Sequence, residues 1–348
     1  MENKIKKRSE KSFISYFKKS WKESSTFSTA VALFVMIILQ TLALGFDFSD
    51  GFGFWLLRWG RNWINILRNN SNIGIISLGM TFVIISGGID LAVGSALVAI
   101  GAFLMVFINV SGGVLSSIGI VGVPAYIIAI ILSLLVGFLL GSFTGVIITY
   151  GKLPPFIATL GTMKIFRSVT QQFMQGNNPQ VPKPFLQIAS VEVFNLMIMP
   201  IIYWIIIAYI LNLVSKRTAF GKHVYAVGSN ERAAALSGIN VKKVKLFVYA
   251  LMGFLVAIAA VLQVSRIGAM DYANAGAGYE MDAISAVIVG GTSMSGGRGT
   301  IGGTILGVLI ISVMNNLLNL LGVPPFLREA FKGVIVICAV LLQKKEED

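Results

Sequence analysis

Residues 123–149 read VPAYIIAIILSLLVGFLLGSFTGVIIT and contain no charged side chain. An α-helix of this length covers about 40 Å, which exceeds the ~30 Å hydrocarbon core of a bilayer. Apolar runs of similar character recur along the chain and predict a bundle of membrane-spanning helices. The predicted spans number ten and lie near residues 27–45, 66–86, 90–109, 123–149, 156–175, 196–214, 244–265, 282–296, 300–321 and 326–343.

The composition of the 348 residues indicates the same fold class. Apolar residues make up 55% of the chain and charged residues 12%, whereas a soluble domain has about 25% charged residues. So few charges cannot cover the surface of a soluble protein of this size. The single cysteine (Cys338) and single histidine (His223) exclude a disulfide framework and a thiolate or histidine metal site. The sequence predicts an all-α polytopic membrane protein with about ten transmembrane helices.

The net charge of +13 is distributed as in a membrane protein. Eight basic residues lie within the first 22, and seven lie between Lys216 and Lys245. Both groups flank apolar runs, which is typical of cytoplasmic segments, so we expect no nucleic-acid partner. The predicted division is a basic cytoplasmic tail at 1–25, a transmembrane domain at 26–343 with a cytoplasmic loop at 215–243, and a cytoplasmic tail at 344–348.

A tryptophan-rich segment precedes the second predicted span. Trp55, Trp59 and Trp63 recur every four residues and therefore lie on one face of a helix. Tryptophan is favoured at the membrane–water interface, so we predict an amphipathic interfacial helix between Phe54 and Leu67. Stacking of the indoles on a sugar ring is the alternative.

Two glycine clusters interrupt the apolar runs. One is Ser86-Gly87-Gly88-Ile89-Asp90, the other covers 290–299, and each contains Ser-Gly-Gly. Irregular backbone at membrane depth occurs inside protein or beside a water-filled path, and broken segments in both halves of a chain are typical of transport sites. The clusters therefore predict glycine-broken spans near a transport site and suggest an internal duplication.

Few acidic or amide side chains lie in the predicted spans, and these complete the set of candidates for a solute pathway. Asp90 follows the first glycine turn, and we favour a role as the cap of the next helix. Amides such as Gln263 bind solute hydroxyls or join helices, and both alternatives stay open. The candidate pathway residues are Ser86, Gly87, Gly88, Asp90, Asp282, Asn315, Asn316 and Asn319.

The predicted cytoplasmic loop contains a short helical segment. Asn230 is a preferred N-cap residue, Gly238 a preferred stop, and three consecutive alanines between them favour a helix of little bulk. Such a segment is suited to dock into a partner, and a plain connecting turn is the alternative. The chain contains no G-x-x-x-x-G-K-[ST] loop, so we expect this chain itself to bind no ATP and no other cofactor.

Four stretches together resemble the motifs of the membrane permeases of ribose- and galactose-type ABC importers. The resemblance covers most of the chain from about residue 60 to the end. The stretches are 79–95 (GMTFVIISGGIDLAVGS), 225–239 (YAVGSNERAAALSGI), 278–284 (GYEMDAI) with 290–297 (GGTSMSGG), and 315–323 (NNLLNLLGV).

The resemblance implies a multi-pass permease in the cell membrane of a prokaryote, surrounded by membrane lipid. Its implied partners are cytoplasmic ABC ATPase subunits, an extracytoplasmic solute-binding protein, and a second permease copy in a homodimer or related heterodimer. Arg232 stands where the broader importer pattern has Glu, and the Trp segment also departs from the family pattern. The resemblance places the ATPase-coupling helix at Asn230, Glu231, Arg232, Ala233, Ala234, Ala235 and Gly238.

The implied function is ATP-driven import of a monosaccharide or related small polar solute, by a chain that is not itself an enzyme. A permease for nucleosides or branched-chain amino acids is the first alternative, because related permeases share the glycine-rich motifs. An ion-coupled secondary carrier is the second. Such carriers use buried ionisable groups for coupling, and this sequence has few of them.

Overall fold

The structure is a computed structural model that describes residues 25–46, 48–49, 51–177, 179–193 and 196–347. The basic tail predicted at 1–25 lies outside the described residues except for Ser25. The helices are α2 (Ser25–Leu44), α3 (Phe52–Ile85), α4 (Val93–Phe107), α5 (Val114–Ser117), α6 (Val123–Thr149), α7 (Pro155–Met174), α8 (Lys183–Ser190), α9 (Met199–Arg217), α10 (Ala219–Ser229), α11 (Glu231–Leu236), α12 (Val241–Ile267), α13 (Tyr279–Val289), α14 (Ile301–Leu320) and α15 (Pro325–Glu347).

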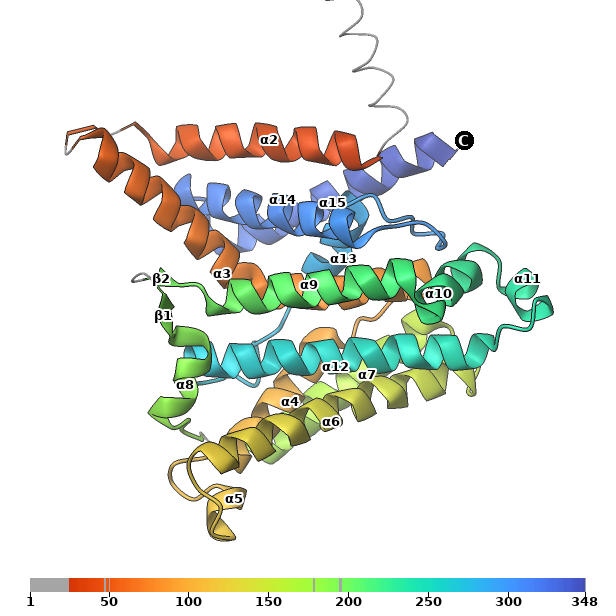
Figure 1. The fold of residues 1–348 in the computed structure, drawn as a ribbon, viewed down its shortest axis with the longest axis horizontal. Helices are drawn as coiled ribbons and strands as arrows, with labels where there is room; N and C mark the ends of the chain where they lie inside the picture. Colours follow the sequence, from red (N-terminus) through yellow and green to blue (C-terminus); the bar gives the residue numbers. More distant parts are fainter. Residues whose placement is uncertain (1–24, 47, 50, 178, 194–195, 348) are drawn as a thin grey trace, which may run out of the picture.

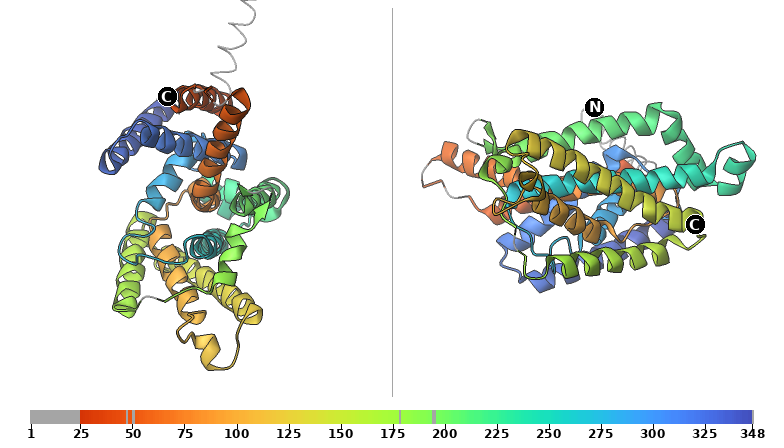
Figure 2. Two further views of the ribbon diagram at one scale, coloured as in Figure 1. Left: turned by 90° about the vertical axis from the view of Figure 1, so that its left-hand side faces the viewer. Right: turned by 90° about the horizontal axis from the view of Figure 1, so that it is seen from below.

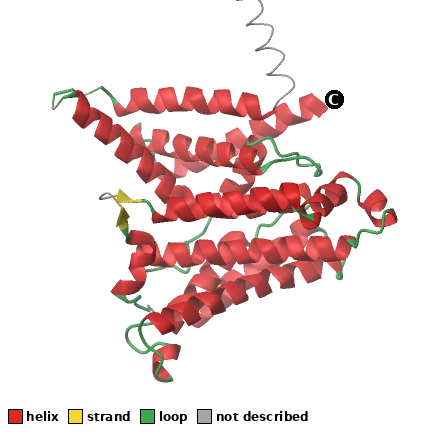
Figure 3. Ribbon diagram, in the orientation of Figure 1, coloured by secondary structure: helices red, strands yellow, loops and turns green. Residues whose placement is uncertain are grey.

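The prediction of an all-α polytopic fold is confirmed (Figures 1 and 3). The strands recorded in the described residues are the two-residue β1 (Glu192–Val193) and β2 (Leu196–Met197), which pair antiparallel. Each of the ten predicted spans overlaps one helix, although α4 and α13 are shorter than the predicted spans. Four of the described helices, α6, α9, α12 and α14, are long and apolar enough to cross a membrane by length and composition.

The tryptophan-rich segment is the start of α3 and not a separate helix, so the prediction of a separate helix is wrong, while its place at the membrane interface stays a prediction. Helix α3 runs without a break over 34 residues, because Gly60 alone does not stop it. The indole Nε1 of Trp55 donates to the Gly45 carbonyl at 2.8 Å, and that of Trp59 donates to the Thr41 hydroxyl at 3.1 Å. The tryptophans therefore fasten the start of α3 to the end of α2 and its following turn.

Two helices reach only part of the way across the bundle. At 1.5 Å per residue, α4 is about 22 Å long and α13 about 16 Å, both shorter than the ~30 Å hydrocarbon core. They meet at their starts, where a Cβ atom added to Gly94 would collide with the Gly276 carbonyl. The prediction of glycine-broken segments is therefore confirmed.

The same glycine turn ends α3 and α13. In α3 the Gly88 N–H donates to the Val83 carbonyl and Gly87 has φ +79°, and in α13 Thr292 and Gly291 (φ +86°) take the corresponding places. This is the Schellman arrangement, in which glycine adopts the left-handed conformation. The eighth span consequently ends at Val289 and not near 296. The local counterpart of 86–88 is 290–292, and not the Ser-Gly-Gly at 295–297.

The connecting segments gather at the two ends of the bundle. Helices α10 and α11, the start of α2 and the end of α15 lie at one end, and α5, α8 and the hairpin lie at the other (Figure 1). At the α10 end, the Thr29 hydroxyl donates to the Val289 carbonyl at 3.0 Å, and the Tyr225 hydroxyl donates to the Gly299 carbonyl at 2.8 Å. The α2 start, the 215–243 loop and the 290–299 turn therefore share one end, as the even number of spans predicts.

The most extensive helix contact joins α6 and α12 in the core. Gly137 and Gly141 lie four residues apart on α6, and added Cβ atoms there would strike the backbone of α12 near Gly253. Small residues at such spacing let two membrane helices approach closely, so dispersion contacts hold the pair together. The large apolar side chains left exposed on α6, among them Ile127, Ile131 and Leu135, lie on the opposite face.

Candidate functional site

The starts of α4 and α13 meet inside the bundle, and the buried Asp90 lies just ahead of α4. Asp90 is 5% exposed, and its Oδ1 accepts the Ala92 N–H at 2.8 Å. The predicted cap is corrected by two residues: Ala92 is the N-cap residue of α4, and Asp90 closes the turn ahead of it. Its carboxylate thus fixes the path by which the chain returns from the end of α3 into the bundle.

The loop at 268–278, which leads from α12 into α13, is held by α7. One guanidinium nitrogen of Arg167 donates to the carbonyls of Tyr272, Ala273 and Ala275 at 3.2, 3.4 and 2.8 Å. Asp271 in the loop accepts the Asn274 side-chain N–H at 2.8 Å, and this bond with others holds the pKa of Asp271 below its ordinary value. The loop before α13 is therefore an ordered segment whose position depends on Arg167.

Two buried polar contacts join helices in the core. Asn72 and Tyr279 both donate to the side-chain oxygen of Gln263, which is 7% exposed. The first of the two alternatives for Gln263, binding a solute hydroxyl, is thus less favoured than joining α3, α12 and α13.

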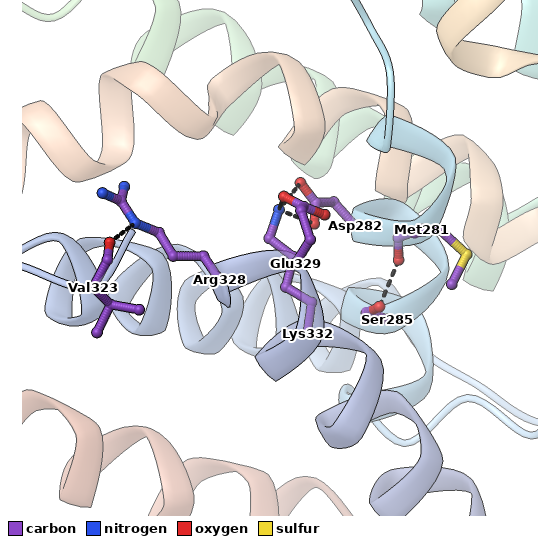
Figure 4. A network of polar contacts seen from close by, with 7 residues as sticks. All are labelled: Met281, Asp282, Ser285, Val323, Arg328, Glu329 and Lys332. Carbon is purple, nitrogen blue, oxygen red and sulfur yellow. Dashed lines mark hydrogen bonds and ion pairs between the residues drawn. The ribbon is translucent and has the colours of Figure 1, made fainter. Parts of the chain in front are cut away.

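Asp282 on α13 forms an ion pair with α15 (Figure 4). The Lys332 Nζ lies 2.9 Å from the Asp282 Oδ1 and 2.9 Å from the Glu329 Oε1. Asp282 is 5% exposed, whereas the Glu329 side chain is 62% exposed. The carboxylate is committed to Lys332, and its assignment to the solute pathway stays a prediction.

The candidate pathway residues lie at different levels of the bundle. Ser86, Gly87 and Gly88 lie at the α10 end, where the Gly297 N–H donates to the Ile85 carbonyl at 2.9 Å. The asparagines of α14 lie about 20 Å further along the bundle by the helix rise. There Asn316 Nδ2 donates to Asn62 Oδ1 on α3 at 3.4 Å. The structure brings the two glycine clusters together and separates both from Asn315, Asn316 and Asn319.

Helix α7 carries a polar face that the sequence interpretation missed. Helix α7 lies at an outer edge of the bundle and packs against α4 and α6 (Figure 2). Gly161, Lys164, Ser168 and Gln171 are all exposed and follow one another at intervals of three or four residues, so they share one face of α7. Lys164 makes no ion pair or hydrogen bond within the described residues. The signal was present in the sequence as the polar i, i+4, i+7 series Lys164, Ser168 and Gln171 within a predicted span.

The predicted docking segment is a helix with the expected ends. Asn230 Oδ1 accepts the Ala233 N–H at 2.9 Å, and Gly238 has φ +84° beyond the last turn of α11. Helix α11 projects beyond the ends of the long helices (Figure 1). Its side chains divide into a buried Ala234, 4% exposed, and a Leu236 that is 90% exposed. The exposed face of α11 thus carries a large apolar side chain, and the docking role of this helix stays a prediction.

Helix α10 connects this segment to the glycine turns. A Cβ on Gly228 would collide with the Ile85 carbonyl, which shows how closely α10 approaches the end of α3. The Tyr225 hydroxyl is bonded to the carbonyl of Gly299, and burial raises the pKa of Tyr225. Helix α10 therefore packs against α11 and contacts the turns that follow α3 and α13.

Replacing Gly297 with alanine is expected to impair folding and transport more than the same change at Gly87. Both have positive φ, which costs a non-glycine residue about 1–2 kcal/mol. Gly87 has open space around it, whereas a Cβ on Gly297 would lie 2.7 Å from the Ser229 Cα. Thermal unfolding midpoints of the two purified variants measure the difference. Equal midpoints would show that contact between the 295–299 turn and α10 is unimportant.

An all-helical bundle with broken spans is typical of a membrane permease. Residues 62–340 match the family described as "Branched-chain amino acid transport system / permease component", and the chain belongs to this family. It is a multi-pass membrane transport protein. No solved structure gives a significant match to the chain.

Three relatives are similar over most of their length. The ribose import permease protein of Bacillus subtilis (strain 168) is 42% identical over 293 residues, which cover 82% of this chain and 85% of the relative. That of Escherichia coli (strain K12) is 37% identical over 339 residues, covering 95% and 97%. The D-allose transport system permease protein of the same strain is 34% identical over 284 residues, covering 81% and 83%.

Proposed function

We propose that this chain is the permease subunit of an ATP-driven importer that moves a monosaccharide or a related small polar solute. The observation that carries the proposal is similarity over 95% of the chain to a permease named for ribose import. Further relatives are named for D-allose and xylose transport. The polar α7 face and the neutral amides of α14 suit an uncharged, hydroxyl-rich solute.

Two alternatives are less favoured. The family description names branched-chain amino acids, but the relatives cited above are named for sugars. An ion-coupled carrier needs a buried ionisable group that is free to exchange its ion. Asp90 is committed to the Ala92 N–H and Asp282 to Lys332, so neither buried carboxylate suits that role.

The proposed partners follow from what the chain contains and lacks. The sequence has no phosphate-binding loop, so a cytoplasmic ATPase pair binds the ATP and docks on α11. An extracytoplasmic binding protein delivers the solute to the opposite end of the bundle. The orientation assigned here puts α10, α11 and both termini in the cytoplasm, because basic residues gather at that end.

The polar face of α7 supports pairing with a second permease copy. A lysine in the middle of a span is costly to expose to hydrocarbon, by roughly 3 kcal/mol on insertion scales. Lys164 lies at mid-length of α7, is exposed, and has no partner within the described residues. We therefore infer that a second copy covers this face of α7 and encloses a water-filled path along Gly161, Lys164, Ser168 and Gln171.

Uptake into proteoliposomes tests the function. Permease reconstituted with its ATPase and binding protein is expected to take up ribose only with internal ATP, without inhibition by a protonophore or by leucine. Replacing Lys164 with methionine is expected to lower uptake about tenfold, the effect of losing one hydrogen bond to a charged group. Lys183→Met, at the start of α8, serves as the matched control. Uptake that collapses with the protonophore would establish a secondary carrier.

Site-directed labelling tests the orientation. In a Cys338→Ser background, Ser117→Cys on α5 is expected to react with a membrane-impermeant thiol reagent in intact cells, because Ser117 is exposed at the end of the bundle that faces outward in the proposed orientation. Ser237→Cys beside α11 is expected to react only after permeabilisation. The reverse pattern would invert the proposed topology.

A further inference from the structure

A groove of about 500 Å³ lies between α9 and the start of α14. From α14 it is lined by the first turn, 300–303, and by Ile305. From α9 it is lined by one helical face: Trp204, Ile205, Ala208, Tyr209, Asn212 and Lys216. Ile205 is 60% exposed and Tyr209 65% exposed, so the groove opens on the outer surface of the bundle.

The groove is graded from apolar to basic along its length. Along α9, Trp204, Ile205 and Ala208 line the part further from α10, whereas Asn212 and Lys216 line the part nearer to α10, where Thr300 begins α14. Lys216 is exposed and makes no ion pair within the part of the chain that the structure describes. A basic side chain at one end of an apolar groove matches the charge and polarity of an anionic phospholipid.

The length of the groove also matches one lipid leaflet. From Trp204 to Lys216 the helix rises about 18 Å, and the hydrocarbon of one leaflet is about 15 Å thick. The apolar end therefore reaches the middle of the bilayer when Lys216 lies at its surface. One acyl chain extended beside α9 fills this distance.

We propose that this groove binds an anionic phospholipid of the leaflet at the α10 end. Its phosphate is paired with Lys216 and hydrogen-bonded by Asn212 and Thr300, and an acyl chain lies along α9. This site goes beyond the proposed function, which assigns no role to the groove. Because the α9 end continues into α10, a bound lipid stabilises the helix that leads to the docking segment.

Lipid titration of the purified full-length permease in detergent tests the proposal. Phosphatidylglycerol is expected to bind more tightly than phosphatidylcholine with the same acyl chains and to raise the thermal unfolding midpoint more. Lys216→Gln is expected to weaken phosphatidylglycerol binding about fivefold, the effect of one basic residue near an anionic surface. Lys243→Gln, at the start of α12 outside the groove, is the matched control and is expected to bind as the wild type does.

A second variant fills the groove without disturbing the fold. A Cβ on Gly302 meets no atom within 4 Å, so Gly302→Phe is expected to fold and to lose binding of both lipids. Equal midpoints with the two lipids, or unchanged phosphatidylglycerol binding in Lys216→Gln and Gly302→Phe, would overturn the proposal. Disulfide formation between two copies of Tyr209→Cys, in a Cys338→Ser background, would show that a second copy covers the groove instead.

Discussion

Replacing Lys332 with methionine is expected to destabilise the permease by about 3–5 kcal/mol, because it leaves a buried carboxylate without its partner. Asp282 is 5% exposed and lies 2.9 Å from the Lys332 Nζ. Methionine fills a similar volume but donates no hydrogen bond, so the charge of Asp282 stays uncompensated. The expected measurement is a large fall in the thermal unfolding midpoint of the purified protein.

Two further variants separate the buried pair from its exposed neighbour. Glu329 is bonded to the same ammonium group, but its side chain is 62% exposed. Glu329→Gln is therefore expected to lower the free energy of unfolding by less than about 1 kcal/mol. Asp282→Leu combined with Lys332→Met removes both charges and is expected to recover most of the lost stability. Equal falls in the midpoint for Lys332→Met and Glu329→Gln would show that burial of the pair has no energetic consequence.

The ion pair illustrates which parts of the site a single sequence can predict. Asp282 was a candidate because an acidic residue in a span is costly unless it has a role. Its partner, Lys332, is 50 residues further along the chain. Hydropathy assigns each residue to a helix but does not specify which helix faces of α13 and α15 meet. The candidate was therefore predictable, and its contact with α15 was not.

The fold could be predicted from the sequence more completely than the site. Hydropathy and glycine residues determine where a helix lies and where it ends without reference to distant parts of the chain. Apolar runs predicted the long helices, and Gly87 marked the end of α3 through its positive φ. The failures come from tertiary packing. The Trp55 and Trp59 indoles bond to α2 and its following turn, which makes their segment the start of α3. Lys164 could not be recognised from the average hydropathy of its span, because that average does not distinguish the exposed polar face of α7 from its buried face.

The ends of α11 could be predicted from the sequence, whereas the exposed face of α11 could be found only from its packing in the structure. Asn230 caps α11 and Gly238 ends it, as predicted. Which alanine faces a partner depends on how α11 lies against α10 and α12. Ala234 is 4% exposed, so a substitution there tests the packing of this chain. Leu236 is 90% exposed and is the side chain that tests docking.

Replacing Leu236 with glutamate is expected to weaken ATPase binding roughly thirtyfold, because burying a leucine in a partner groove contributes about 2 kcal/mol. The introduced carboxylate would also be buried without a partner, which adds to the loss. Leu236→Met keeps an apolar side chain of similar volume and is the matched control. Because Leu236 makes little contact within the chain, both variants are expected to insert and unfold as the wild type does. Co-purification of the ATPase and solute-stimulated ATP hydrolysis in reconstituted membranes measure the effect. Normal binding and stimulation in Leu236→Glu would exclude α11 as the docking helix and would place the ATPase contact elsewhere on the α10 end of the bundle.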